Sequence, residues 1–277
     1  FGSDAQKEKW LPGVADGSLV LSAALLEPGS EDPVQPCSVH AAAEGTGFCL
    51  TGVKTCVPYA RQSARVLLSA ATEEGPVVLL LDPQAAGVSM ADMRVTTYEP
   101  QCEMVLDAAL VPAEDVLAGP AEGAAVMEWL AERTIAALCA HQTGISDQSM
   151  RMTASYTAER EQFGVPIATF QAVGHRAANC FIDVECLRLN TYQAVSLLDS
   201  ETEATNEVQI AKVWAGDVGH RVSYASQHLH GGPGIDRAYP LWRFCLWARH
   251  NETMLGGSGR QLAALGERIA AGEAYCA

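Results

Sequence analysis

The chain has 277 residues, of which 48% are hydrophobic, and a formal net charge of −15 at pH 7. This length can form one large domain or two ordinary domains with a sizeable core. The negative charge argues against a general basic surface for nucleic acid, and no apolar run is long enough to cross a bilayer. A small anionic ligand held by a local arginine is still possible at this charge.

Nine cysteines are scattered along the sequence without any C-x-x-C pair. Because zinc motifs need closely spaced ligands, we expect no metal site. An odd number of cysteines in a chain of this length indicates reduced thiols, used mainly as small apolar residues. Together with the lack of a charged and then apolar leader, the cysteines predict a cytoplasmic protein.

The first part of the sequence, from residue 18 to about 112, consists of short apolar runs separated by Gly and Pro. The runs are LVL (19–21), FCLT (48–51), VLL (66–68), VVLLL (77–81) and MVL (104–106). This spacing is typical of an antiparallel barrel or sandwich. We therefore predict a β domain over residues 1–115.

The pattern becomes helical after residue 112. Residues 121–160 contain no proline, which predicts one helix roughly 55–60 Å long. Further helices are expected over residues 168–198, 204–229 and 241–271. Long antiparallel helices joined by short loops are typical of a four-helix bundle. The sequence thus predicts an α+β fold, with a C-terminal four-helix bundle over residues 116–277.

Two turns in the helical part carry residues that suit a phosphate ligand. The segment REQFGVPI (160–167) is followed by Gln171, and HLHGGPG (228–234) lies downstream. A guanidinium matches phosphate oxygens bidentately, an aromatic ring can stack on adenine, and a glycine pair lets backbone N–H groups approach an anion. Alternatively, both segments are ordinary helix-ending turns, in which His228 and His230 meet terminal carbonyls.

In this order, the two segments resemble the C-terminal half of the acyl-CoA dehydrogenases. In that family, an Arg-x-x-Phe-Gly turn and a Gln-x-x-Gly-Gly-x-Gly turn reach across a dimer interface to the pyrophosphate and adenine of FAD. The opening segment FGSDAQKEKWLP resembles the end of the family's N-terminal helical domain, so we expect that domain to be absent from this chain. The resemblance implies FAD contacts from Arg160, Phe163, Gln171, Gly231, Gly232 and, at the position of the family's Gln, His228.

The residues that match the family's flavin-ring contacts have changed type. The family's Thr-Glu-Pro-Gly segment reads LEPG here (26–29), and its Lys-x-Trp-Ile-Thr segment reads KTCVP (54–58). Leu26 and Pro58 therefore replace two hydroxyl donors, and Cys56 replaces an aromatic cover. A buried flavin edge would lose about 1–3 kcal/mol for each missing donor. We expect this chain not to hold a flavin ring of its own.

The base that removes the α-proton is also missing from its family position. In most members a Glu precedes a Gly-Thr pair, and Leu255 stands there in this sequence. Some relatives place a Glu on the first bundle helix, at the position that Thr134 occupies here. Glu132 is the remaining candidate, although it lies about 200° round the helix from Thr134 and fits an exposed charged stripe with Glu128 and Arg133. We expect no catalytic residue in this chain.

This combination resembles the short subunits of heteromeric, α2β2 acyl-CoA dehydrogenases of actinobacterial steroid catabolism. There, one subunit type binds the flavin ring and supplies the base, and the other keeps the adenine-side contacts. The resemblance implies a flavoprotein oxidoreductase of lipid β-oxidation, active as a hetero-oligomer, with FAD held mainly by a second acyl-CoA dehydrogenase-like subunit. It also implies a bulky acyl-CoA substrate, such as a steroid side-chain thioester. A self-sufficient homotetramer with an atypical base, and a non-enzymatic scaffold of the same fold, stay open.

Overall fold

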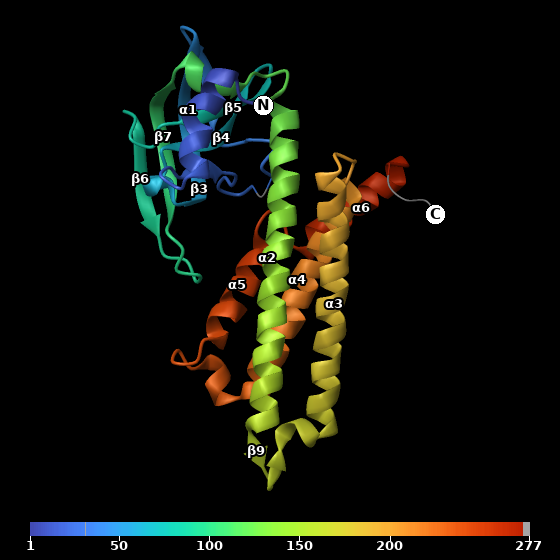
Figure 1. Cartoon of the computed structure of the whole chain (residues 1–277). Coiled ribbons are helices and arrows are strands. Elements are labelled where there is room, and N and C mark those ends of the chain that lie inside the picture. The colour runs from blue at the N-terminus through green and yellow to red at the C-terminus, as the bar shows by residue number, and fades with distance from the viewer. Residues whose placement is uncertain (31, 274–277) are drawn as a thin grey trace. The chain divides into compact units, whose positions relative to one another are not determined.

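The computed structural model describes residues 1–30 and 32–273. The chain forms two compact units, Phe1–Ala131 and Glu132–Ala277. The first unit contains the eight-stranded sheet and the second contains most of the helices (Figure 1). The end of the predicted β domain, residue 115, lies just ahead of the last strand of the first unit.

The first unit is a helix followed by one eight-stranded sheet with strand order β6-β7-β3-β2-β4-β5-β8, in which β1 also pairs with β4. Helix α1 begins with a capping box, in which Ser3 and Gln6 exchange side-chain and backbone hydrogen bonds. Two short 3₁₀ turns interrupt the strands. The elements are α1 (Asp4–Ala15), β1 (Leu21–Ala24), β2 (His40–Glu44), β3 (Gly47–Pro58), η1 (Ala60–Gln62), β4 (Arg65–Thr72), β5 (Gly75–Leu81), β6 (Val88–Met93), β7 (Gln101–Val111), η2 (Ala113–Asp115) and β8 (Val116–Ala118).

The sheet is mixed, which corrects the prediction of a purely antiparallel arrangement. Strand β1 runs parallel to β4, and β2 makes one parallel pair with β4 between His40 and Ala71. The remaining pairings are antiparallel. The apolar runs located the strands, but the partner of a strand depends on contacts between distant segments, which a run of apolar residues does not encode.

The core of the first unit lies under β3, β4, β5 and β7. The run VVLLL of β5 is buried along its whole length, which is typical of a strand covered on both faces. Residues 54–58 belong to β3, and Leu26 forms an isolated antiparallel bridge with Thr55 of that strand. The sheet therefore holds the segments 26–29 and 54–58 next to each other.

The second unit is a helical bundle. Its first helix is α2, whose first residues belong to the first unit. Helices α2, α3 and α4 share one apolar core, and α4 also contacts α5 and α6. Figure 1 shows the small hairpin of β9 and β10 at the end of the bundle where α2 ends. The elements are α2 (Gly123–Glu159), β9 (Glu161–Gln162), β10 (Val165–Pro166), η3 (Ile167–Thr169), α3 (Gln171–Asp199), α4 (Thr205–His230), η4 (Gly232–Ile235), α5 (Leu241–Thr253) and α6 (Ser258–Ala271).

The last predicted helix, over residues 241–271, is wrong as a single helix. The chain leaves α5 after Thr253 and starts α6 at Ser258. Between them Leu255 and Gly256 have φ values of 54° and 87°, a left-handed conformation that ends a helix. The glycine pair 256–257 is the local signal for this break.

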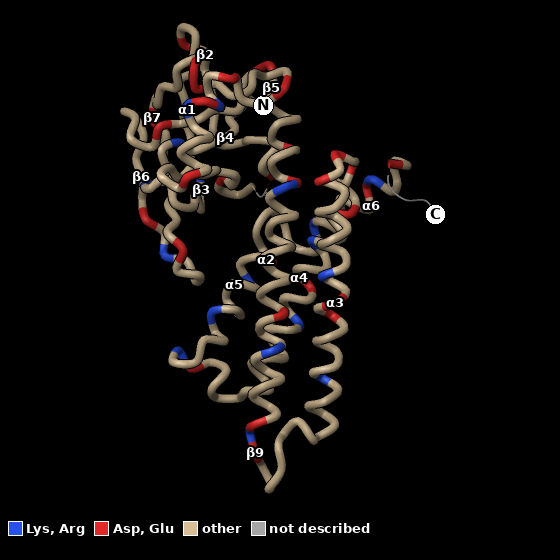
Figure 2. Tube along the Cα trace, in the orientation of Figure 1, with Lys and Arg blue, Asp and Glu red and all other residues tan. Residues whose placement is uncertain are grey.

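Charges are distributed over both units. In Figure 2 the Lys and Arg positions are dispersed among the Asp and Glu positions along the trace. None of the helices in the described part of the chain is both long and apolar enough to span a membrane.

Candidate functional site

The first motif forms a short hairpin that directly follows α2. The backbone N–H of Ile167 donates a hydrogen bond of 2.8 Å to the carbonyl of Arg160, and β9 pairs antiparallel with β10. The two loop residues, Phe163 and Gly164, have φ values of 56° and 80°. Two positive φ values in a two-residue loop indicate a type I′ turn, for which glycine is favoured. The Phe-Gly pair therefore shapes the turn that presents Arg160 and Phe163.

The side chains of this hairpin face outward. Phe163 has 94% of its surface exposed, and its ring meets that of Phe170 edge-on with centroids 6.2 Å apart. Arg160 and Gln171, the first residue of α3, are also exposed. Because a phenylalanine this exposed adds little to the core, its ring is free to contact a second molecule.

The second motif forms the turn between α4 and η4. Gly231 has φ 63° and ψ −133°, and its N–H donates to the carbonyls of Gln227 (3.0 Å) and His228 (3.3 Å). An L-residue rarely adopts this backbone conformation, so the turn requires glycine. A Cβ added at Gly231 or at Gly232 would meet no atom within 4 Å. The backbone of the glycine pair is thus open to an approaching ligand.

Side-chain contacts bring the two motifs to the same end of the bundle. A guanidinium nitrogen of Arg176, in the first half of α3, lies 2.7 Å from Nδ1 of His228. The hydroxyl of Tyr156, one helical turn before Arg160, donates a hydrogen bond of 3.3 Å to the carbonyl of His230. The two motifs therefore lie in one region, although 56 residues of sequence separate Gln171 from His228.

His230 is buried and holds the glycine turn in place. Its Nδ1 lies 2.8 Å from the carbonyl of Ser226, and its Nε2 lies 3.2 Å from the hydroxyl of Tyr239. Its ring stacks on Tyr156 with centroids 4.3 Å apart. Burial lowers the pKa of His230, against a smaller opposite effect of the Ser226 carbonyl. The helix-end role predicted for the two histidines thus holds for His230, whereas His228 contacts Arg176.

The lowered pKa of His230 makes the stability of the chain depend on pH. In the unfolded chain His230 has an ordinary pKa of about 6.5, so the unfolded state binds more protons as the pH falls below that value. We expect the free energy of unfolding to decrease between about pH 6.5 and the lower folded pKa. Urea denaturation at several pH values should show a flatter dependence for His230→Gln. Equal slopes for the two proteins would contradict this expectation.

Two residues of this region were not predicted from the sequence. Tyr156 stacks on His230, and Arg176 contacts His228. Tyr156 lies one helical turn before Arg160, which directly follows α2, and this spacing is the signal in the sequence that places Tyr156 near the motif. Nothing local in the sequence links Arg176 with His228, because the contact joins two helices.

The positions that match the family's flavin-ring contacts lie in the first unit and provide no side-chain donor of the family type. The N–H of Thr55 donates to the carbonyl of Leu26 at 3.0 Å. Cys56 has a φ of 52°, and the carbonyl of Pro58 accepts a hydrogen bond from Ser22. These residues are partly exposed. They fit the flavin ring poorly, because neither Leu26 nor Pro58 can replace the hydroxyl of threonine.

A buried ion pair supports these two segments. Lys54 Nζ lies 2.7 Å from Glu27 Oε1, and both side chains are 1% exposed. The backbone N–H groups of Cys37 and Val39 also donate to the Glu27 carboxylate, at 2.6 Å and 3.3 Å. Burial alone would raise the pKa of Glu27, but the hydrogen bond and charge of Lys54 hold it below its ordinary value. Burial also lowers the pKa of Lys54, against the opposing hydrogen bond and charge of Glu27. Through these buried contacts the pair anchors both segments.

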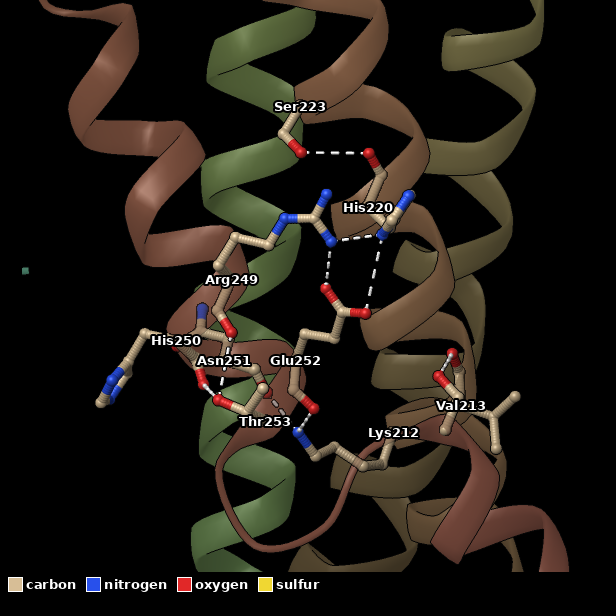
Figure 3. A network of polar contacts seen from close by, with 10 residues as sticks. Lys212, Val213, His220, Ser223, Arg249, His250, Asn251, Glu252 and Thr253 are labelled. Carbon is tan, nitrogen blue, oxygen red and sulfur yellow. Dashed lines mark hydrogen bonds and ion pairs between the residues drawn. The ribbon is translucent and has the colours of Figure 1, made fainter. Parts of the chain in front are cut away.

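The position of the family's usual base contains no acid. Leu255 is 3% exposed and lies in the link between α5 and α6. Figure 3 shows the polar residues of α4 and of the end of α5, the helix that precedes this link. Glu252 accepts a hydrogen bond of 2.6 Å from Arg249 and lies 3.7 Å from Nδ1 of His220. The buried Lys212 donates to the backbone carbonyls of residues 251 and 252, so it caps the end of α5.

Glu132 is less exposed than the sequence predicts. Its side chain is 22% exposed, and its carboxylate accepts a hydrogen bond of 3.0 Å from the hydroxyl of Thr205 on α4. Arg133 lies 3.5 Å from the second carboxylate oxygen. Glu132 is therefore half-buried at a helix contact rather than part of an exposed stripe, because α4 covers it. The described residues include no group of three or more His, Cys, Asp or Glu placed to hold a metal ion.

The fold and the motifs agree with comparisons to known proteins. Residues 121–270 match the family described as "Acyl-CoA dehydrogenase, C-terminal domain". The chain is 34% identical to acyl-CoA dehydrogenase FadE27 of Mycobacterium tuberculosis over 278 residues, which cover 98% of this chain and 72% of that protein. It is 32% identical to FadE28 of the same organism over 268 residues, with 97% and 75% covered.

Solved structures give the same result. The structure of the ChsE4-ChsE5 complex from Mycobacterium tuberculosis matches with a TM-score of 0.90 and 34% identity, covering 98% of this chain and 71% of that one. A variant of the Tcur3481-Tcur3483 steroid ACAD matches with a TM-score of 0.89 and 37% identity, covering 98% and 73%. With a family match over more than half of its length and a relative 34% identical along nearly all of it, the chain belongs to the acyl-CoA dehydrogenase family.

Proposed function

We propose that this chain is a subunit of a flavin-dependent acyl-CoA dehydrogenase and lends contacts to FAD that a second, related subunit mainly holds. One observation carries the proposal: the adenine-side motif is kept at one end of the bundle, with His228 in place of the family's Gln, whereas Leu26 and Pro58 cannot donate to a flavin ring. FAD, when bound, accepts the hydride that leaves the acyl thioester. The proton acceptor then belongs to the other subunit, because Leu255 cannot take a proton.

Each residue of the motif has a role that its position supports. The exposed guanidinium of Arg160 pairs with the pyrophosphate, and the exposed ring of Phe163 stacks on adenine. Gln171 and His228 donate hydrogen bonds, and the open backbone at Gly231 and Gly232 lets the cofactor approach closely.

The relatives support a partner and a substrate class. ChsE4-ChsE5 is described as a complex, and Tcur3481-Tcur3483 is described as a steroid ACAD. We infer that this chain assembles with a second acyl-CoA dehydrogenase-like subunit and that the complex acts on a bulky CoA thioester, such as a steroid side-chain acyl-CoA.

Flavin content tests the proposal directly. Expressed alone, the chain should be nearly colourless, since it lacks donors for the flavin ring. Co-expressed with a related subunit, for which a gene next to its own is the first candidate, it should purify as a yellow complex. The measurement is flavin absorbance per mole of chain. A yellow protein with near-stoichiometric FAD from the chain alone would contradict the proposal, and a colourless product with every related subunit would favour a scaffold.

The half-buried carboxylate of Glu132 favours one alternative, a self-sufficient homotetramer with an atypical base. If the base lies on the partner, Glu132→Gln should keep most of the turnover of the complex. The matched control is Glu128→Gln, one turn earlier on α2 and exposed. Loss of several orders of magnitude in turnover for Glu132→Gln alone, with FAD and substrate still bound, would identify Glu132 as the base.

A further inference from the structure

The contact between Arg176 and His228 lies beside the proposed cofactor motif without belonging to it. The nitrogen atoms are 2.7 Å apart, and the guanidinium carbon lies 5.9 Å from the ring centroid of Tyr224. Arg176 and Tyr224 also border a groove of about 310 Å³ between α3 and α4. No family motif described above includes Arg176.

The geometry of the contact fixes the tautomer of a neutral His228 ring. A guanidinium carries only donors and stays charged, so it donates and Nδ1 of His228 must accept. A neutral imidazole has one N–H group, which therefore lies on Nε2. His228 is exposed, and none of the described residues is recorded as a hydrogen-bond partner of its Nε2. The ring thus presents one N–H group that a ligand can reach.

His228 stands at the position of the family's Gln, so this N–H group is the side-chain donor available there. A Gln side chain always carries an NH₂ group, whereas a neutral histidine donates from one of two nitrogens according to its tautomer. We propose that Arg176 is a positioning residue, which holds His228 in the Nε2–H form so that it donates to the FAD shared with the partner subunit. This inference rests on the proposed function, and it assigns to Arg176 an action through His228 rather than a direct contact with the cofactor.

A second Arg-His contact in the same unit provides a matched control. Arg249 donates to Nδ1 of His220, two turns earlier on α4. There Glu252 also faces the same ring, at 3.7 Å (Figure 3), and neither His220 nor Arg249 lies in the motif. Arg249→Met removes the same kind of contact outside the proposed site.

The test is a double-mutant cycle on the flavin affinity of the co-expressed complex. Arg176→Met should weaken FAD binding by about threefold to tenfold, the effect of one hydrogen bond. In a His228→Gln background, Arg176→Met should not weaken FAD binding further, because the amide of Gln carries a donor whether or not Arg176 is present. Arg249→Met should leave flavin affinity unchanged. Equal losses in both backgrounds would show that Arg176 contacts the cofactor itself and would overturn the inference.

A spectroscopic measurement keeps the test independent of assembly. The ¹⁵N chemical shifts of the His228 ring should show a protonated Nε2 in this chain and a mixture of tautomers in Arg176→Met. A tautomer mixture in the unmodified chain would also overturn the inference. The proposed function fails separately, if Arg160→Ala leaves flavin affinity unchanged.

Discussion

Replacing Arg160 by alanine is expected to lower the flavin retained by the complex at least about tenfold, while the helical bundle stays folded. A charge-assisted hydrogen bond is worth about 1.5–3 kcal/mol, and the exposed Arg160 side chain makes no ion pair among the described residues. Removing the side chain should therefore change the stability of the fold little, but it should weaken FAD binding strongly by removing the proposed contact with the pyrophosphate. Flavin absorbance of the purified complex, with circular dichroism as a check of folding, measures both effects.

Two variants sharpen this prediction. Arg160→Lys should recover only part of the flavin, because an ammonium group cannot reproduce the planar fork of the guanidinium. Arg151→Ala removes an exposed arginine of α2, which pairs with Asp147 at 2.7 Å, and should leave the flavin content unchanged. An unchanged flavin content in Arg160→Ala would exclude a role for Arg160 at the cofactor.

Replacing Lys54 by methionine is expected to destabilise the first unit by about 3–5 kcal/mol, because the buried Glu27 carboxylate would lose its counter-ion. The two side chains are 1% exposed and their charged atoms lie 2.7 Å apart. Denaturant titration followed by circular dichroism and tryptophan fluorescence measures the loss. The double variant with Glu27→Gln should regain part of it, since no charge is then left buried without a partner.

The matched control for Lys54 is an ion pair of the same unit that faces solvent. Arg61 and Asp92 are 47% and 77% exposed, with 2.7 Å between their atoms. Arg61→Met should have a far smaller effect, because water already screens that pair. If the two variants had similar effects, the ion pair of Glu27 and Lys54 would not be what stabilises these segments.

The sequence by itself determined the types of the elements and the family. The proline-free stretch that became α2, and the apolar runs that became β3, β4, β5 and β7, are local patterns, and local patterns decide whether a segment is helical or extended. The Phe-Gly and Gly-Gly pairs also indicated turns, because glycine is the residue that adopts positive φ values most easily, as Gly164 and Gly231 do. The loss of donors at Leu26 and Pro58 is a matter of residue type and also needs no structure.

Only the tertiary structure decided which residues meet. Strand β1 pairs with β4 in parallel, and Glu27 forms an ion pair with Lys54. Thr205 of α4 donates a hydrogen bond to Glu132. Arg176 and His228 lie on separate helices and meet only because α3 packs against α4. Such contacts depend on how whole elements bury their apolar faces together, and that choice minimises the free energy of the entire core rather than of any one segment.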